Sequence, residues 1–128
     1  MLTALDSSLY FQYIGTMDAR EAVTALGALA QESRLEVFRL LVQRGPAGLP
    51  AGEISERVGV PATTLSFHLA QLSHAGLLTS RRDGRSIIYA ADYGEMQTLL
   101  GFLMKNCCRD SACAPQSLPQ RVTLRKRR

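Results

Sequence analysis

Residues 50–76 read PAGEISERVGVPATTLSFHLAQLSHAG and predict two short helices that meet at a tight corner. In the first helix Ile54 and Val58 lie four residues apart, on one face. Gly59 supplies the left-handed conformation that ends a helix sharply, and Val60 avoids helical geometry because a proline follows it. The second helix has an apolar stripe that predicts its buried face: Leu65, Leu69 and Leu72.

The rest of the second helix carries mostly small hydrogen-bonding side chains: Thr63, Thr64, Ser66, Phe67, His68 and Gln71. Two short helices across a glycine corner, with such a surface on the second, are the layout of a DNA-binding helix-turn-helix. An ordinary helical hairpin is the alternative that this stretch alone leaves open.

A basic hairpin is predicted directly after these helices. Residues 77–80 and 86–89 favour strands, and Asp83-Gly84 between them is typical of a tight hairpin turn. The tip carries Arg81, Arg82 and Arg85. A solvated charged turn would explain them, but their position beside a DNA-reading helix favours contact with phosphates. A helix-turn-helix followed by such a hairpin is a winged helix.

Length and charge place the chain among globular proteins with a basic end. A chain of 128 residues is long enough for one domain with a modest core, and no apolar run reaches membrane-spanning length. The start of the chain lacks the early basic residues of a signal peptide, so we expect a cytoplasmic protein with no membrane partner. Residues 121–128 hold five positive charges, whereas the other 120 residues carry 10 basic and 11 acidic side chains. The net charge of +4 therefore comes from the tail, and the arginines of the hairpin are better evidence for nucleic-acid binding.

Three further helices are predicted around this unit. Asp18 and Glu21 have capping-box spacing at the start of a helix to about residue 30, and Asp92 and Glu95 repeat that spacing before the last helix. Residues 32–44 form the helix between them, with Leu35 expected to face inward. The other residues expected inside these two earlier helices are Ala22, Leu26, Leu29, Ala30, Phe38, Leu41 and Val42.

The last helix has an apolar stripe too wide for a solvent-exposed helix, made of Met96, Leu99, Leu100, Leu103 and Met104. A second subunit is the cover we expect, because paired reading helices raise specificity. Packing within one chain is the alternative. The predicted dimer interface comprises Leu26, Met96, Leu99, Leu100 and Leu103.

These elements give the expected organisation. Residues 1–17 form an N-terminal arm, residues 18–113 form the DNA-binding and sensing domain, and residues 114–128 form a disordered basic tail. The expected fold is mainly α with a small β-hairpin, a winged helix-turn-helix in the order α-α-α-α-β-β-α that dimerises through its terminal helices.

All three cysteines lie within seven residues at the end of the last helix: Cys107, Cys108 and Cys113. Burial as small apolar side chains explains Cys107 alone, since only that residue extends the apolar stripe. A structural disulfide fits badly, because adjacent residues are too close for an unstrained bond and the cytoplasm is reducing. On a helix Cys107 and Cys108 would project about 100° apart, and a short link lets Cys113 fold back to them.

Three thiolates without a fourth ligand favour a soft ion. Zinc usually takes four ligands, often including histidine, and both histidines of this chain belong to the reading helix. A trigonal-pyramidal ion such as As(III) or Sb(III) needs only three sulfurs. The spacing alone does not fix the ion.

Residues 18–113 resemble the ArsR family of metal-responsive repressors, through the runs LAQESRLEVFRLLVQRG, EISERVGVPATTLSFHLAQLSHAGLLTSRRDGRSIIYA and KNCCRDSAC. The likeness is to arsenic-sensing members whose ligands are a Cys-Cys pair at the end of the last helix plus one downstream cysteine. It implies a homodimeric transcriptional repressor that leaves its operator DNA when As(III) or Sb(III) binds, so that arsenic-resistance genes are expressed. The first helix of the helix-turn-helix has no cysteine and the last helix has no histidine, so two other ligand sites of the family are absent.

The resemblance carries the DNA contacts onto the start of the second helix and onto the hairpin: Ala62, Thr63, Thr64, Ser66, Phe67, His68, Arg81, Arg82 and Arg85. Phe67 is suited to a thymine methyl group. Two alternatives on the same fold stay open, a thiol redox sensor that oxidises Cys107 or Cys108 against Cys113 and a zinc or cadmium sensor. No residue pairing in the sequence supports an enzyme, and no organic cofactor is expected.

Overall fold

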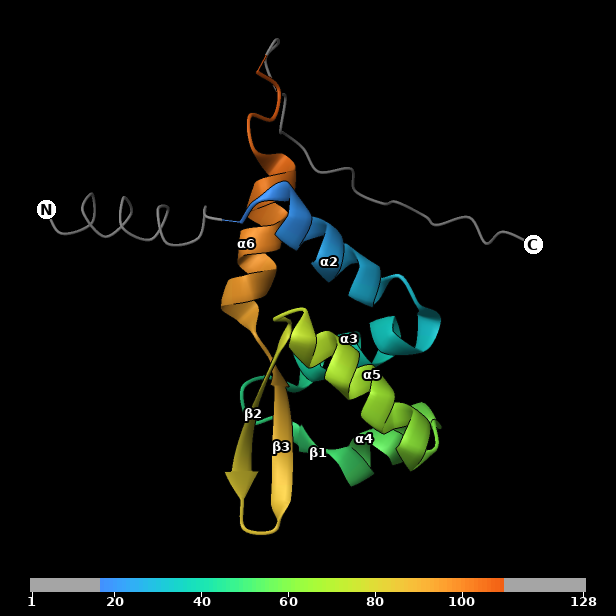
Figure 1. Cartoon of the computed structure of the whole chain (residues 1–128). Helices are drawn as coiled ribbons and strands as arrows, with labels where there is room; N and C mark the ends of the chain where they lie inside the picture. The colour runs from blue at the N-terminus through green and yellow to red at the C-terminus, as the bar shows by residue number, and fades with distance from the viewer. Residues whose placement is uncertain (1–16, 110–128) are drawn as a thin grey trace, which may run out of the picture.

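The computed structural model describes residues 17–109, arranged as helices packed on a small sheet (Figure 1). The predicted N-terminal arm apart from Met17, the basic tail and Cys113 lie outside the described residues. The elements, in chain order, are α2 (Ala19–Leu29), α3 (Glu32–Arg44), β1 (Leu49–Pro50), α4 (Ala51–Val58), α5 (Ala62–His74), β2 (Leu78–Asp83), β3 (Ser86–Ala91) and α6 (Tyr93–Met104). This order confirms the predicted winged helix-turn-helix, with one short strand added.

Side-chain caps fix where the outer helices begin. The Asp18 carboxylate accepts a hydrogen bond from the Glu21 backbone N–H at 2.8 Å, and the Glu21 carboxylate accepts one from the Asp18 N–H at 3.0 Å. This capping box satisfies two backbone donors that the first turn of α2 leaves open. At α6 the Asp92 carboxylate accepts from the Glu95 N–H at 3.0 Å. Both predicted helix starts are thus confirmed.

The helix-turn-helix forms as the sequence predicts. Gly59 ends α4 with φ of 70°, in the left-handed region that favours glycine. The Ser55 hydroxyl donates to the carbonyl of Val60 and closes the corner before α5 begins. The apolar stripe of α5 is buried, with Leu65, Leu69 and Leu72 at most 3% exposed. α5 is therefore held by one face, and the opposite face is left for other contacts.

The sheet has three antiparallel strands in the order β1-β3-β2, where the sequence predicted a two-stranded hairpin. β1 pairs Leu49 with Tyr89 and Pro50 with Ile88. Gly48 precedes this strand with φ of 70°, and a side chain there would collide with the Tyr89 backbone carbonyl. The close approach of the 46–48 loop to β3 therefore depends on that glycine.

The β2–β3 hairpin, hereafter the wing, turns one residue later than the sequence predicted. Asp83 pairs with Ser86, so the two loop residues are Gly84 and Arg85. Gly84 is the first loop residue and has φ of 67°, because this kind of two-residue hairpin turn requires a positive φ at its first position, which glycine adopts easily. The shift places Arg85 at the tip of the wing.

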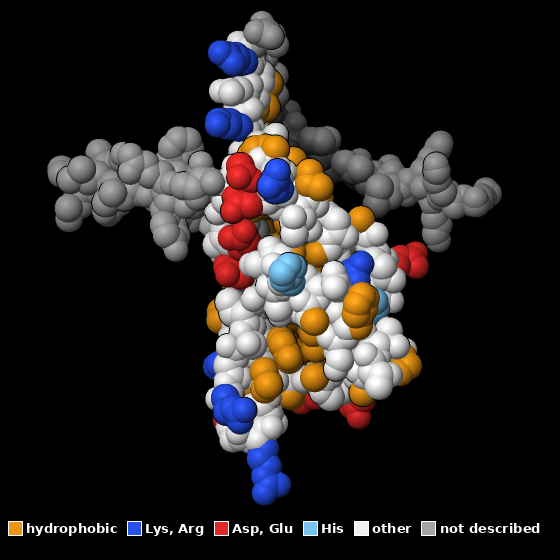
Figure 2. All heavy atoms as spheres, viewed as in Figure 1, with side chains coloured by type: hydrophobic (Ala, Val, Ile, Leu, Met, Phe, Trp, Pro, Cys, Tyr) orange, Lys and Arg blue, Asp and Glu red, His pale blue; other side chains and the backbone are white. Residues whose placement is uncertain are grey.

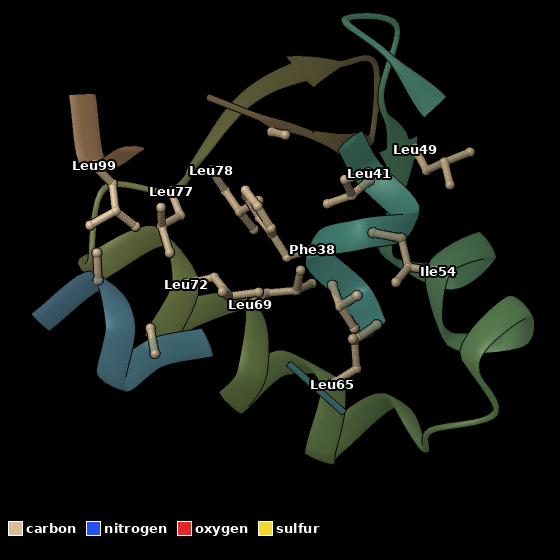
Figure 3. Close-up of a cluster of buried hydrophobic side chains, with 14 of the residues drawn as sticks. Phe38, Leu41, Leu49, Ile54, Leu65, Leu69, Leu72, Leu77, Leu78 and Leu99 are labelled. Carbon is tan, nitrogen blue, oxygen red and sulfur yellow. The ribbon is translucent and has the colours of Figure 1, made fainter. Parts of the chain in front are cut away.

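The core lies where α3, α4 and α5 meet the sheet and α6 (Figure 3). Its fully buried large side chains are Val37, Leu41, Leu49, Ile54, Leu65, Leu72 and Leu77. α2 contributes small residues instead of large ones, namely Ala22, Ala25 and Ala28. The expectation that Leu26 and Ala30 face inward is wrong, because the alanine face lets α2 approach closely and turns both outward. Leu35 is also exposed, at 43%, contrary to expectation.

α6 is fastened to the core at its first turn. The Tyr93 hydroxyl donates to the Val42 carbonyl at 2.9 Å, at the end of α3. The Asp92 backbone N–H donates to the Leu77 carbonyl, just after α5, at 2.9 Å. From this anchored end α6 runs beside α2 to the end of the molecule opposite the wing (Figure 1). Among the helices within residues 17–109, none combines the length and apolar character that a membrane crossing requires.

Candidate functional site

The exposed face of α5 presents five of the six residues predicted to contact DNA there: Ala62, Thr63, Thr64, Ser66 and Phe67. Pro61 is the N-cap and makes no side-chain capping bond, so backbone N–H groups of the first turn stay available to an outside acceptor. Short hydroxyl side chains beside such N–H groups suit a phosphate and the edges of bases. The start of α5 thus has the chemistry of a reading helix.

His68 lies inside the molecule, which corrects the expectation that it shares this exposed face. Its side chain is 7% exposed, and its Nδ1 finds no hydrogen-bond partner among the described residues. Burial lowers the pKa of His68 below its ordinary value of 6.5, and the positive charge of Arg34 lowers it further. A neutral, buried imidazole is not placed to meet DNA.

Phe67 is the large apolar side chain on the exposed face, and it has a cationic neighbour. The Phe67 side chain is 56% exposed. The guanidinium carbon of Arg34 lies 6.0 Å from the centre of its ring, within the range of a cation–π contact. Sequence analysis missed this contact, because it joins residues 33 positions apart.

The wing separates its three arginines into two roles. Arg81 donates to the backbone carbonyls of Ala47 at 2.9 Å and Pro46 at 3.4 Å, so it ties the wing to the α3–β1 loop. Arg82 and Arg85 are exposed, and Figure 2 shows basic side chains at the wing tip. Phosphate contact stays a prediction for all three arginines, but Arg81 already uses two of its five N–H donors within the chain, so Arg82 and Arg85 are better suited to it.

The cysteines lie in a turn rather than on a helix. α6 ends at Met104, and residues 105–109, hereafter the cysteine turn, follow it. Asn106 and Cys108 have φ of 61° and 58°, in the left-handed region that non-glycine residues seldom adopt. The Sγ atoms of Cys107 and Cys108 lie 3.6 Å apart at the surface. The expectation that these two side chains diverge around a helix is therefore wrong.

The sulfur pair has the spacing that one soft ion requires. Two thiolates bound to one ion at about 2.3 Å, at a tetrahedral angle, lie about 3.8 Å apart. Cys113 is outside the described residues, and within residues 17–109 no three of His, Cys, Asp or Glu are grouped as a metal site. Cys108 is also disulfide-bonded, contrary to the expectation that a structural disulfide fits badly here. Three thiolates at this turn therefore require that bond to be reduced.

Large apolar side chains are exposed on α2 and α6. Leu26, Leu100 and Leu103 are exposed as a dimer interface requires, and they form one set with Val23 and Met104. Leu99 is 4% exposed and belongs to the chain's own core, which leaves little of it for a partner, and Met96 is partly buried against that core. Sequence analysis did not include Val23, whose exposure depends on how α2 rotates.

Known proteins are similar to this chain in both sequence and fold. A family model described as a helix-turn-helix domain matches residues 29–81. The uncharacterized HTH-type transcriptional regulator YceK of Bacillus subtilis is 33% identical over 98 residues, which cover 74% of this chain and 97% of that protein.

Three solved structures have similar folds. An ArsR-like transcriptional regulator from Rhodococcus sp. RHA1 has a TM-score of 0.61 at 29% identity, over 67% of this chain and 78% of that one. The homodimeric winged helix-turn-helix domain of Mb0332 from Mycobacterium bovis, a possible ArsR-family regulator, has a TM-score of 0.54 at 25% identity, over 71% and 90%. A possible transcriptional regulator for arsenical resistance has a TM-score of 0.54 at 26% identity, over 62% and 79%.

The matched relatives are transcriptional regulators and not enzymes, and the solved structures share the fold. The family model spans the helix-turn-helix, and one structural neighbour is itself a homodimeric winged helix-turn-helix domain. The chain belongs to the ArsR family of winged-helix transcriptional regulators.

Proposed function

We propose that this chain is a homodimeric repressor that binds operator DNA through α5 and the wing and releases it when As(III) or Sb(III) binds at the cysteine turn. The observation that carries the proposal is the exposed Cys107–Cys108 sulfur pair, at 3.6 Å, at the end of α6 remote from the wing. Soft trivalent ions prefer thiolate ligands, and Cys113 would supply the third sulfur. The structural neighbour named for arsenical resistance supports the same ligand class.

DNA binding is supported by the exposed side chains of α5 and of the wing. The exposed hydroxyl side chains of α5 suit base edges, and Arg82 and Arg85 suit phosphates. One helix reads only a few base pairs, so a single copy would bind with little specificity. Two copies joined by a twofold axis would read two half-sites of an operator.

The dimer is supported by the exposed apolar side chains of α2 and α6. Val23 and Met104 are 66% and 60% exposed, and Leu26, Leu100 and Leu103 are between 41% and 53% exposed. Such a set is costly in water and suits a matching apolar surface. A second copy of the chain fits it, as in the homodimeric neighbour.

The coupling follows from the position of the sulfur pair. An ion shifts the balance between free and DNA-bound protein only by its difference in affinity for the two states. The cysteine turn directly follows α6, which carries part of the proposed dimer surface. Drawing three sulfurs together would move the end of α6 against the partner, and the two reading helices would change their spacing.

Fluorescence anisotropy of a labelled duplex, selected from a random library with the wild-type protein, tests this function. Cys107→Ser, Cys108→Ser and Cys113→Ser should each bind the duplex nearly as well as the wild type when reduced. They should lose release by As(III), with Cys113→Ser affected least because the adjacent pair can still hold a singly methylated arsenical. Lys105→Gln, in the same turn, is the matched control and should keep normal release.

Two results would contradict the three-thiolate site. Full release by As(III) from all three cysteine variants would show that the sulfurs are not ligands. Failure of these variants to bind DNA without the ion would show that the cysteines serve the fold instead. Titration with Cd(II) and Zn(II) beside As(III) and Sb(III) tests the zinc or cadmium alternative.

A thiol redox regulator is a second candidate, which the Cys108 disulfide favours. In this case the Cys108 thiol and a second cysteine thiol lose two electrons and two protons as the S–S bond forms, and peroxide is reduced to water. Peroxide should then release the duplex without any ion, and a dithiol reductant should restore binding. Growth of thiolate-to-arsenic charge-transfer absorbance with As(III), without loss of binding to peroxide, favours the first proposal.

A further inference from the structure

Arg34 joins three helices at one point. Its backbone N–H donates to the Gln31 side chain at 2.8 Å, which caps α3. Its Nε donates to the Ala28 carbonyl at 2.8 Å, in the last turn of α2. Carbonyls in a last turn lack partners within their own helix, and a positive charge there is favoured by the helix dipole. The guanidinium is therefore fixed to α2 although the residue belongs to α3.

The same guanidinium faces the Phe67 ring of α5, at 6.0 Å from its centre. Phe67 is 56% exposed, so the protein alone encloses less than half of this side chain. A cation over the ring face attracts the ring's electrons and favours one orientation among those that solvent would allow. Arg34 thus restrains an aromatic ring that is more than half exposed.

His68 bounds the Phe67 ring on another side. The two ring centres lie 6.0 Å apart with their planes tilted by 56°. His68 is buried, and both burial and Arg34 lower its pKa, so it stays neutral at ordinary pH. A neutral imidazole leaves Arg34 as the cation that acts on the Phe67 ring.

We propose that Arg34 is a positioning residue, whose guanidinium, fixed to the end of α2, holds the Phe67 ring where it meets a thymine methyl group. The inference rests on the proposed DNA binding by α5 and deepens it. α2 also carries Val23 and Leu26 of the proposed dimer surface, so the restraint sets the ring relative to the helix that meets the partner. A direct bond from Arg34 to a DNA phosphate is the competing role.

The test uses a duplex selected with the full-length wild-type protein and copies in which each thymine in turn is replaced by deoxyuridine. Deoxyuridine removes only the methyl group from the major groove. At one thymine per half-site we expect wild-type affinity to fall about fourfold, the factor that burial of one methyl group contributes. Phe67→Ala should bind both duplexes equally.

Arg34→Gln should reduce that fourfold methyl dependence to nearly none, and Arg34→Lys should restore part of it. Arg39→Gln removes the same charge from an exposed position on α3 and is the matched control, so it should keep the wild-type dependence. Phe67→Leu keeps an apolar side chain without an aromatic face. In that background Arg34→Gln should have no further effect, because two residues that act together are not additive. Circular dichroism and thermal melts check that each variant is folded.

Each outcome bears on one claim. A wild-type protein that binds no duplex in the library contradicts the proposed function, whatever Arg34 does. Binding without any thymine methyl dependence overturns the role of Phe67 and with it that of Arg34. Unchanged methyl dependence in Arg34→Gln, with a salt slope lower by about 0.9 for each phosphate that is no longer neutralised, assigns Arg34 to phosphate and overturns the proposal.

Discussion

The two ends of this molecule expose opposite kinds of side chain. At the α5 and wing end, buried leucines hold a surface of hydroxyl groups and arginines, with Phe67 and Ile87 as its large exposed apolar members. At the α2 and α6 end, large apolar side chains stand at the surface, and the buried face of α2 is made of alanines. The first end suits a polar, charged partner, whereas the second is left incomplete by its own chain. The kind of side chain that each end exposes therefore separates the proposed DNA-binding surface from the proposed dimer surface.

Two leucines one helical turn apart give the sharpest test of the apolar end. Leu99 is 4% exposed and Leu103 is 52% exposed. Leu99→Asp places a charge in the core and should lower the free energy of unfolding by about 3 kcal/mol or more, which is a large part of the stability of a small domain. Leu103→Asp should leave the monomer folded and remove the dimer. Thermal melts and size-exclusion chromatography with light scattering measure both effects.

The opposite result would break the comparison. A Leu103→Asp protein that stays dimeric would remove α6 from the interface. A Leu99→Asp protein that is folded but monomeric would return Leu99 to the interface that the sequence first suggested.

At the polar end, the wing arginines should separate in their effect on DNA binding. Arg82→Ala with Arg85→Ala should weaken binding to all sequences alike and lower the salt slope by about 0.9 for each phosphate that these side chains neutralise in the wild type. Arg81→Ala should leave that slope nearly unchanged, because its guanidinium donates to Ala47 and Pro46 instead. Arg81→Ala should instead lower the melting temperature. Anisotropy titrations over a range of salt concentrations give the slopes, and an equal slope change for all three arginines would contradict the division.

The smallest expected effect concerns pH, and its sign differs between the two ends. The pKa of His68 is lowered from 6.5 in the folded chain, mainly by burial and then by Arg34. Above pH 6.5 the imidazole is neutral in both states, so it contributes nothing. As pH falls through 6.5 the unfolded chain takes up the proton first, and stability falls. Urea midpoints above and below pH 6.5 should show this decline in the wild type and less of it in His68→Leu.

Glu95, in the first turn of α6, supplies the opposite trend. Burial raises its pKa above 4.5, and Asp92 and Glu21 raise it further. The folded chain therefore holds this proton more tightly, so the contribution is present at low pH and is lost as pH rises through the raised pKa. The same urea series on Glu95→Gln should lack that loss. Identical pH profiles for Glu95→Gln and the wild type would contradict the raised pKa.

Local signals in the sequence predicted most of the fold. The helix Glu32–Arg44, the Asp18 capping box and the Gly59 corner were confirmed because each depends on residues within a few positions of one another. β1 was missed because a strand of two residues is too short to show the alternation of apolar and polar side chains that predicts a strand. Its pairing also depends on Ile88 and Tyr89, far along the chain.

The candidate site was less predictable, because its side chains depend on neighbours from other elements. Hydrogen-bonding residues on α5 were predicted from periodicity, yet α5 rotates so that His68 turns inward. The end of α6 at Met104, rather than at the cysteines, follows from left-handed backbone at Asn106 and Cys108 that no motif announces. Helical periodicity also gave no reason to choose alanine over leucine as the inner face of α2.

The hydrogen bonds of Tyr93 and Asp92 hold α6 at its first turn, so any swing of this helix pivots about that end. Twelve residues at the helical rise give an arm of about 18 Å, so a swing of about 10° moves its far end by about 3 Å. If two copies are joined through α6, the same rotation turns the rest of each chain about the first turn of that helix. The strands of the wing extend about 20 Å in the opposite direction, so the wing tip moves by a similar distance. That movement is close to the 3.4 Å by which neighbouring phosphates of one strand advance along the DNA axis, so a rotation small enough to spare the core can carry Arg85 out of register with the DNA.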